Sequence, residues 1–271
     1  MRASIIYTVV GAVIMFGLVP QAKSACTSPN SILNGTYGWQ GEALMTSGNS
    51  SHPKVGDYVP LVQNGHLTFD GNGNFSGAHD TNLGGELIPH VDSGTYSVNS
   101  DCITGTIAFG TGVGFTMSFV ITSGGQEIKY VSATTGGVNF GTLRPVGAPC
   151  TAGTLSGNSY GYSSHGLIAS GKGNGFPRVG GFVPFSDAGQ ILFAADGSIS
   201  GTDNQNLGGV VIPGQTIAGT YTVNSDCTGS TTMTIAGVDQ SWDFVILQGA
   251  DQVIFLATPS GVVWGGTLTK E

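Results

Sequence analysis

Hydrophobic and polar residues alternate with a period of two along much of the chain. The clearest runs set Phe115, Met117, Phe119 and Ile121 against Thr116, Ser118 and Val120, and set Trp242, Phe244 and Ile246 against Ser241, Asp243 and Val245. A period of two is typical of a β-strand with one face toward a core and one toward solvent. We therefore expect a dry and a wet face on each of these strands. Sustained helical periodicity is absent from the sequence, which indicates an all-β protein.

Turn signals divide the first half of the sequence into eight such strands. They span approximately residues 35–44, 59–70, 74–82, 86–98, 104–109, 115–122, 127–133 and 138–144. The second half repeats the same plan. Eight short strands joined by tight turns can remove their exposed edges by closing into a barrel. We predict up-and-down antiparallel β-barrels, with β-sandwiches as the alternative.

The two halves are copies of one another. Residues 94–102, Gly-Thr-Tyr-Ser-Val-Asn-Ser-Asp-Cys, recur almost letter for letter at 219–227. Further collinear matches pair 53–60 with 177–184, 82–85 with 206–209, and 141–143 with 266–268. A repeat of this length is a whole domain with its own core. We predict a signal peptide over 1–24, one barrel over 25–146 and a second over 147–271, with a short Pro-rich joint that packs the two repeats on each other.

The N-terminus and the composition predict an exported protein. Arg2 precedes an apolar run that ends at Ala22-Lys23-Ser24, which is typical of a cleavable export signal and too short for a membrane span. Only 9% of the residues are charged, whereas glycine contributes 46 positions. Without residues 1–24, six Lys and Arg face sixteen Asp and Glu, which makes nucleic acid and anionic membranes poor partners. We expect a secreted or periplasmic protein with no stable membrane insertion after cleavage.

Four cysteines lie at equivalent places in the two copies. Cys26 and Cys150 open the copies, and Cys102 and Cys227 end the repeated segment. Four cysteines allow three pairings, and a duplicated fold favours the same crosslink in each copy. We predict the disulfides Cys26–Cys102 and Cys150–Cys227.

Short segments at the barrel ends resemble known families. Gly35-Thr36-Tyr37-Gly38-Trp39 on the first strand, and Arg144 after the last, resemble the Gly-x-Trp start and terminal basic residue of calycin-type barrels, the lipocalin and avidin group. Copy two departs from this pattern, with Tyr162 and Lys270 nearby. The chain also resembles secreted bacterial proteins of unknown function that carry a Gly-Thr-Tyr-x-Val-Asn-x-Asp-Cys segment. These resemblances imply a barrel fold and no particular activity.

Candidate chemistry is sparse. Asp70-Gly71-Asn72-Gly73-Asn74 has the opening spacing of a calcium loop, but Phe75 replaces the required glycine, so we interpret it as a hairpin turn. The four histidines of copy one are expected to be scattered on loops and rims: His52, His66, His79 and His90. Asp80, Glu86 and Asp92 are interpreted as solvated charges. We predict no catalytic residue, no metal site and no cofactor.

Three functional hypotheses follow. The first is a secreted, non-catalytic protein whose barrels bind a small apolar ligand or act as extracellular interaction modules. Its candidate ligand contacts are the aromatic residues of the dry faces: Trp39, Phe115, Phe119, Tyr130, Trp242, Phe244 and Phe255. The second is a cyclase or isomerase acting on a small apolar substrate, favoured by a cavity that contains a buried carboxylate or histidine. The third, a single outer-membrane barrel of sixteen strands, fits poorly with disulfides and domain-sized copies.

Overall fold

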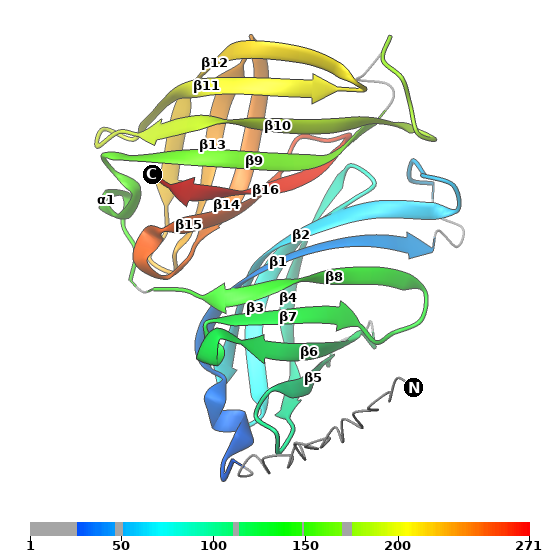
Figure 1. Cartoon of the computed structure of the whole chain (residues 1–271), viewed down its shortest axis with the longest axis vertical. Coiled ribbons are helices and arrows are strands. Elements are labelled where there is room, and N and C mark those ends of the chain that lie inside the picture. Colours follow the sequence, from blue (N-terminus) through cyan, green and yellow to red (C-terminus); the bar gives the residue numbers. More distant parts are fainter. Residues whose placement is uncertain (1–25, 47–50, 111–113, 148, 170–174) are drawn as a thin grey trace, which may run out of the picture.

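The chain folds into two closed antiparallel barrels of eight strands each, in tandem (Figure 1). The computed structural model describes residues 26–46, 51–110, 114–147, 149–169 and 175–271, so the predicted signal peptide lies outside the described residues. Each strand pairs with its neighbours in sequence, and the first and last strands of each barrel close the ring. The predicted up-and-down barrels are confirmed. Because the strands close into two separate rings, sandwiches and a single barrel of sixteen strands are excluded.

The strand boundaries follow the predicted ones closely in the first barrel. Its strands are β1 (Asn34–Thr46), β2 (Tyr58–Asp70), β3 (Asn74–Leu83), β4 (Glu86–Val98), β5 (Thr104–Phe109), β6 (Thr116–Thr122), β7 (Glu127–Ser132) and β8 (Gly137–Pro145). The second barrel consists of β9 (Asn158–Ala169), β10 (Phe182–Phe193), β11 (Ser198–Leu207), β12 (Val210–Val223), β13 (Thr228–Ile235), β14 (Val238–Ile246), β15 (Gln252–Ala257) and β16 (Val262–Lys270). The short helices are η1 (Pro29–Ile32), η2 (Ser123–Gly125), α1 (Ala152–Leu155) and η3 (Gln248–Ala250).

The repeated Gly-Thr-Tyr segment closes one end of each barrel. Tyr96 on β4 donates its hydroxyl hydrogen bond to the Leu33 carbonyl at 2.8 Å, and Leu33, fully buried, follows η1. In the second barrel, Tyr221 donates to the Ala194 carbonyl at 2.9 Å, and the fully buried Leu155 ends α1. The repeat is therefore conserved between the copies because it seals the base of a barrel.

The disulfides act at the same closed ends. The structure joins Cys26 to Cys102 and Cys150 to Cys227, the pairing that the duplication favours. Cys102 and Cys227 both adopt positive φ angles, in turns where an aspartate side chain accepts a backbone hydrogen bond, as Asp226 does from the Thr228 amide at 3.0 Å. Each bridge ties the segment that enters a barrel to the turn after its fourth strand.

The shared Asn-Leu-Gly-Gly segment forms a tight turn. Gly84 and Gly85 make the turn of the β3–β4 hairpin, with φ angles of +58° and +97°. Asn82 caps this turn, since its side-chain oxygen accepts a hydrogen bond from the Gly85 amide at 3.2 Å. Pro89 lies within β4, outside the stretch Gly94–Val98 that pairs with β5, so it removes no donor from that ladder.

The alternation predicted a solvent-exposed outer face for β14, but this face is buried where it meets the first barrel. Val245 is 1% exposed because the outside of β14 and β15 packs against the first barrel. A small apolar cluster joins the two barrels through Val62 of β2 and three residues of the second barrel, namely Phe182, Leu256 and Val263. These four residues form a small apolar core between the two barrels.

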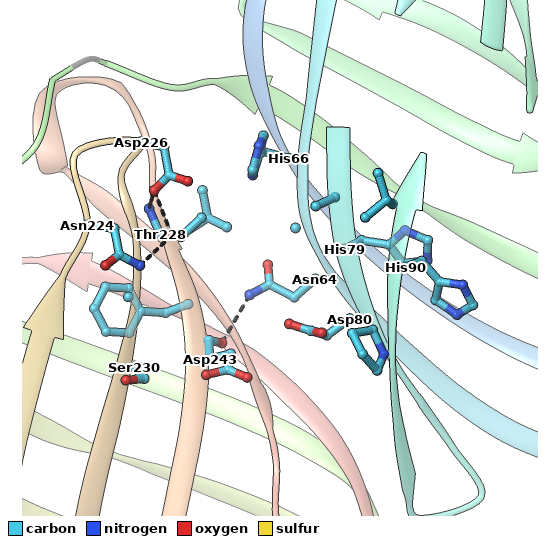
Figure 2. Close-up of a pocket in the computed structure, with 17 residues that line it drawn as sticks. Asn64, His66, His79, Asp80, His90, Asn224, Asp226, Thr228, Ser230 and Asp243 are labelled. Atoms are coloured by element: carbon cyan, nitrogen blue, oxygen red, sulfur yellow. Dashed lines mark hydrogen bonds between the residues drawn. The ribbon is translucent and has the colours of Figure 1, made fainter. Parts of the chain in front are cut away.

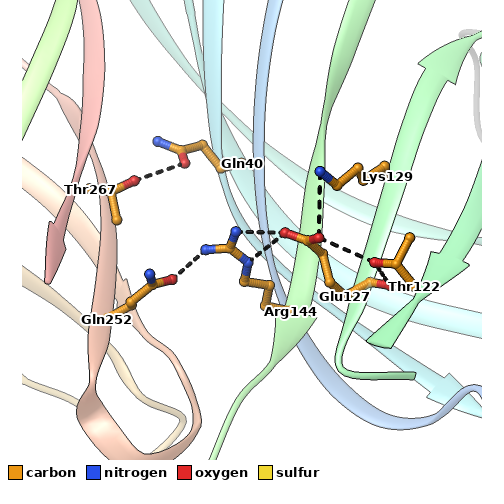
Figure 3. A network of polar contacts seen from close by, with 7 residues as sticks. All are labelled: Gln40, Thr122, Glu127, Lys129, Arg144, Gln252 and Thr267. Carbon is orange, nitrogen blue, oxygen red and sulfur yellow. Dashed lines mark hydrogen bonds and ion pairs between the residues drawn. The ribbon is translucent and has the colours of Figure 1, made fainter. Parts of the chain in front are cut away.

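Polar contacts surround this shared core (Figure 3). The side chain of Gln40 donates to the Gly266 carbonyl at 2.9 Å, and Arg144 reaches across to Gln252. Arg144 also binds Glu127 of its own barrel through two nitrogens, at 2.6 and 3.1 Å, and these hydrogen bonds lower the pKa of Glu127. Arg144 at the end of β8 thus links the two barrels. Among the described residues, no helix is long and apolar enough to cross a membrane.

The Gly84-Gly85 turn touches the second barrel through its backbone, which gives a matched pair of test variants. The Gly261 amide donates to the Gly85 carbonyl at 2.7 Å, and a methyl group on Gly85 would lie 2.6 Å from the Gly261 Cα. The equivalent Gly209 has a similar φ of +89° but meets no other atom within 4 Å.

We expect Gly85→Ala to lower the free energy of unfolding by roughly 2–3 kcal/mol, and Gly209→Ala by only about 1 kcal/mol, from backbone strain alone. Urea denaturation of the two variants measures the difference. Equal losses would show that the contact between the barrels contributes nothing to stability.

Candidate functional site

The seven aromatic residues predicted to contact a ligand lie in or beside the packed cores. Six of them are at most 3% exposed, and Phe115 is partly buried at the edge of the first core; the six are Trp39, Phe119, Tyr130, Trp242, Phe244 and Phe255. Trp242 stacks on Phe255 with ring centroids 4.1 Å apart. These side chains belong to the packed cores that fill the barrel interiors.

The interior of the first barrel contains a connected polar network. Trp39 donates its indole N–H to the Tyr130 hydroxyl at 2.6 Å, and the Tyr130 hydroxyl lies 3.3 Å from the Asn139 Oδ1. Asn139 donates to the Gln63 Oε1 at 3.0 Å, and Gln63 donates to the Thr81 hydroxyl at 3.2 Å. Burial raises the pKa of Tyr130, which keeps its hydroxyl protonated. Each member has a partner, which is the condition under which a buried polar network is tolerated.

Two of the four copy-one histidines, His79 and His90, are not scattered on loops and rims, contrary to expectation. His79 and His90 stack with ring centroids 4.6 Å apart, because the β3–β4 register pairs these two residues directly. His79 also contacts the carboxylate of Asp92, which is therefore not a solvated charge. Burial and the neighbouring His79 lower the pKa of His90. The positions of His79 and His90 are symmetric about the Gly84-Gly85 turn, so a correct hairpin assignment would have predicted their contact.

The second barrel carries acids where the first carries this network. By the alignment of the copies, Asp187 and Asp203 occupy the places of Gln63 and His79. Phe255 and Trp264 occupy the places of Tyr130 and Asn139, the two residues that supply partners in the first barrel. Asp187 has therefore lost the donor that Asn139 provides to Gln63, whereas Asp203 accepts a hydrogen bond from Gln205.

A cavity opens at this point into the mouth of the second barrel. Its volume is about 220 Å³, and its wall is mainly apolar, formed by Ile168, Phe185, Leu207, Ile235, Val262 and Trp264. Its polar lining includes Asp187, Gln205 and Gln240. Asp187 is 5% exposed and Asp203 is fully buried. Apolar walls with a few convergent polar groups are typical of small-molecule sites.

Two acceptor atoms in this cavity lack a donor within the described part of the chain. Ser164 donates to one oxygen of Asp187, but the other oxygen, Oδ2, accepts no hydrogen bond. The buried Oε1 of Gln240 is likewise unpartnered. Gln205 donates to the Asp203 Oδ2 at 2.8 Å. A buried acceptor without a donor destabilises the protein by about 1–3 kcal/mol, so a ligand that brings donors is favoured.

Burial governs the charge of the acidic pair. Removal from water and the negative charge of Asp203 together raise the pKa of Asp187 to about 7, against the hydrogen bond from Ser164, which lowers it. Burial also raises the pKa of Asp203. Near neutral pH the pair can therefore hold or release a proton. Among the described residues, no group of three His, Cys, Asp or Glu side chains is arranged to hold a metal ion.

Neither acid was predicted as a site residue from the sequence. The available signal was the comparison of the copies, in which two acids replace Gln63 and His79 at positions that alternate inward. The exposed turn acid Asp70, by contrast, accepts hydrogen bonds from the amides of Asn72 and Asn74 at 2.7 and 2.9 Å. That geometry confirms the hairpin turn.

The architecture defines the chain as a tandem pair of eight-stranded antiparallel barrels. No family model matches the sequence, and no curated protein matches it. Solved structures with similar architecture include a protein of unknown function from the DUF3598 family of Nostoc punctiforme, with 9% identity over 91% of this chain and 99% of that chain, and a TM-score of 0.25.

Two other solved structures align over similar lengths. CghA is 8% identical over 87% of this chain and 88% of its own, with a TM-score of 0.26. Transferrin binding protein B of Neisseria meningitidis is 8% identical over 88% of this chain and 75% of its own, with a TM-score of 0.29. With TM-scores this low, none of them bears on the function of this chain.

Proposed function

We propose that the protein is an exported small-molecule-binding protein whose second barrel takes a ligand with an apolar body and a protonated amine. The observation that carries this proposal is the unpartnered Oδ2 of Asp187 at the floor of an apolar cavity. The apolar wall matches the small apolar ligand expected from the sequence. The acid adds a requirement for a donor, and an ammonium group offers three donors and a compensating charge.

The first barrel supports the same assignment by contrast. There the equivalent of Asp187 is Gln63, whose side chain receives a hydrogen bond from Asn139 and gives one to Thr81. The polar groups of that network are satisfied without a ligand, whereas Asp187 of the second barrel keeps an oxygen without a donor. Two disulfides suit an oxidising compartment, which agrees with export to the periplasm or outside the cell.

Binding of 2-phenylethylamine, followed by tryptophan fluorescence and calorimetry, tests this function. We expect saturable binding at pH 8, no comparable binding of the neutral 2-phenylethanol, and a loss of roughly tenfold or more in affinity in Asp187→Asn. Trp264 lines the cavity and is one of three tryptophans, so its emission should change on binding.

Asp57→Asn, which removes an exposed acid on a loop of the first barrel, serves as the charge-matched control and should bind like the wild type. Equal affinity for the amine and the alcohol, or binding that is indifferent to Asp187→Asn, would refute the proposal.

A second candidate function uses the same acids for chemistry. A carboxyl group with a pKa of about 7 beside a second carboxyl group is suited to general acid–base catalysis, as a cyclase or isomerase requires. In this case Asp187→Asn would abolish turnover of a bound substrate while leaving the binding of a neutral apolar ligand intact. The amine-binding function predicts instead that Asp187→Asn loses its affinity for the amine ligand.

A further inference from the structure

A second polar cavity lies between the two barrels, separate from the mouth of the second barrel. It is a groove of about 600 Å³, bounded by β2, β3 and β4 on one side and by β13, β14 and the turn before β13 on the other. Figure 2 shows Asn64 and Asp80 pointing from the first barrel toward Asp243 of the second, while the rings of His79 and His90 lie on the other side of their strands. The groove therefore exists only because two copies are packed together.

The lining of the groove is acidic. Three carboxylates, Asp80, Asp226 and Asp243, contribute to it, and no lysine or arginine does so within the described part of the chain. Burial and the nearby charge of Asp80 together raise the pKa of Asp243 to about 6. Burial likewise raises the pKa of Asp80. Asp80 and Asp243 are thus two partly buried acids that repel one another, and the nearby His79 and His90 offset the burial of Asp80 only in part.

Buried acceptor groups in the same groove also lack donors. Asn64 is 3% exposed and donates through its Nδ2 to the Asp243 carbonyl at 3.0 Å, but its Oδ1 has no hydrogen-bond partner. The buried Nδ1 of His66, another lining residue, is also unpartnered. An amide oxygen and two carboxylates that face one space form an acceptor set for a donor-rich cation.

Asp80 and Asp243 are acidic only in the copy whose wall faces the groove. The counterpart of Asp80 in the second copy is Asn204, and the counterpart of Asp243 in the first copy is Ser118. Asn64 likewise corresponds to Ala188. Neither Asn204 nor Ser118 lines this groove, and both are exposed. The two copies have thus acquired different residues on the two walls of one cavity, which indicates that the cavity itself has a role.

We propose that this groove binds an organic polycation through protonated amines, with Asp80 and Asp243 as the anionic contacts and the Asn64 Oδ1 as an additional acceptor. The ammonium groups belong either to a free polyamine or to lysine side chains of a peptide. A volume nearly three times that of the mouth cavity leaves room for more than one ammonium group. The site is independent of the proposed function of the second barrel.

Calorimetric titration of the whole protein with two probes tests the proposal. Spermidine represents a free polyamine, and acetyl-Lys-Lys-Lys-amide represents the side chains of a peptide. The test variant exchanges each acid for its counterpart, Asp80→Asn with Asp243→Ser. Removal of two acids that burial disfavours should leave the protein folded, which circular dichroism checks.

We expect the wild type to bind at least one probe with a single stoichiometric site, and the double variant to bind it roughly tenfold or more weakly. Tighter binding of spermidine identifies a free polyamine, and tighter binding of the peptide identifies a protein partner. Asp57→Asn should leave the affinity unchanged. Asp187→Asn should also leave it unchanged, which separates this site from the mouth of the second barrel.

Four results would overturn the proposal. The first three are the absence of binding of both probes, equal affinity of the wild type and the double variant, and an equal loss in Asp57→Asn, which would indicate attraction to net charge alone. Displacement of the bound probe by an equimolar amount of Ca²⁺ would also overturn it, because that result would identify a metal site instead.

Discussion

Asp187→Asn is expected to make the protein more stable at pH 8 and to reduce the pH dependence of its stability. The gain in the free energy of unfolding should reach at most about 4 kcal/mol at pH 8 and should vanish near pH 4. In thermal unfolding this corresponds to a rise of about 2–4 °C for each kcal/mol. Urea denaturation between pH 4 and pH 8 measures both quantities.

The sign follows from the proton that Asp187 holds in the folded state. Its pKa is raised from 3.8 to about 7 on folding, so between these values the folded state keeps a proton that the unfolded state has released. Stability therefore falls as the pH rises from 4 to 7 and stays low above that range. Asparagine keeps the oxygen that accepts from Ser164 but carries no charge to desolvate.

The control is again Asp57→Asn, whose exposed side chain should leave the pH profile unchanged. A clear slope in the same direction should persist in Asp187→Asn, because the pKa of Asp243 is raised to about 6 and the pKa values of Asp203 and Asp80 are raised too. A destabilised Asp187→Asn protein at pH 8 would mean that the acid contributes to the fold. That result would contradict a site that is kept for a ligand.

Removal of either disulfide is expected to have the next largest effect. The bridges close segments of 76 and 77 residues, so the double variants Cys26→Ala with Cys102→Ala and Cys150→Ala with Cys227→Ala should each lose about 2–4 kcal/mol of unfolding free energy. The reason is the entropy that the unfolded chain regains when a long loop is opened. The two losses should agree closely because both bridges sit at the closed end of a barrel.

Denaturation with and without a reducing agent measures this effect. Reduction should weaken the wild type and the single-bridge variants but leave a variant without cysteines unchanged. A loss below about 0.5 kcal/mol in one barrel only would show that its closed end is held by other contacts, such as the Tyr96 or Tyr221 hydrogen bonds.

The strands and the barrels could be predicted because period-two alternation and tight turns are local signals. The duplication added long-range information, since it located equivalent cysteines. The outer face of β14 was mispredicted because a strand shows the same alternation whether that face meets solvent or another domain. Val245 lies on the face predicted to be exposed, but it is apolar and buried. Local pattern cannot tell solvent from a neighbouring barrel.

The candidate site was missed for a different reason. Aromatic residues were expected to contact a ligand, but their side chains pack closely and fill the barrels. The candidate ligand site lies instead where a buried acid lacks a hydrogen-bond donor. Asp187 becomes notable only when Gln63 and its partner Asn139 are compared with Asp187 and Trp264. That comparison requires the register of the strands, which the sequence alone leaves open.

The contact between the barrels joins unlike faces: β1–β3 of the first barrel meet β14–β16 of the second. Such head-to-tail contacts have no built-in limit, and a further copy could in principle add at either end to form a fibre. Ser186 stands where Val62 packs, and Lys129 stands where Ile254 packs. These two polar replacements remove the apolar contacts that a third barrel would need, which disfavours such an addition.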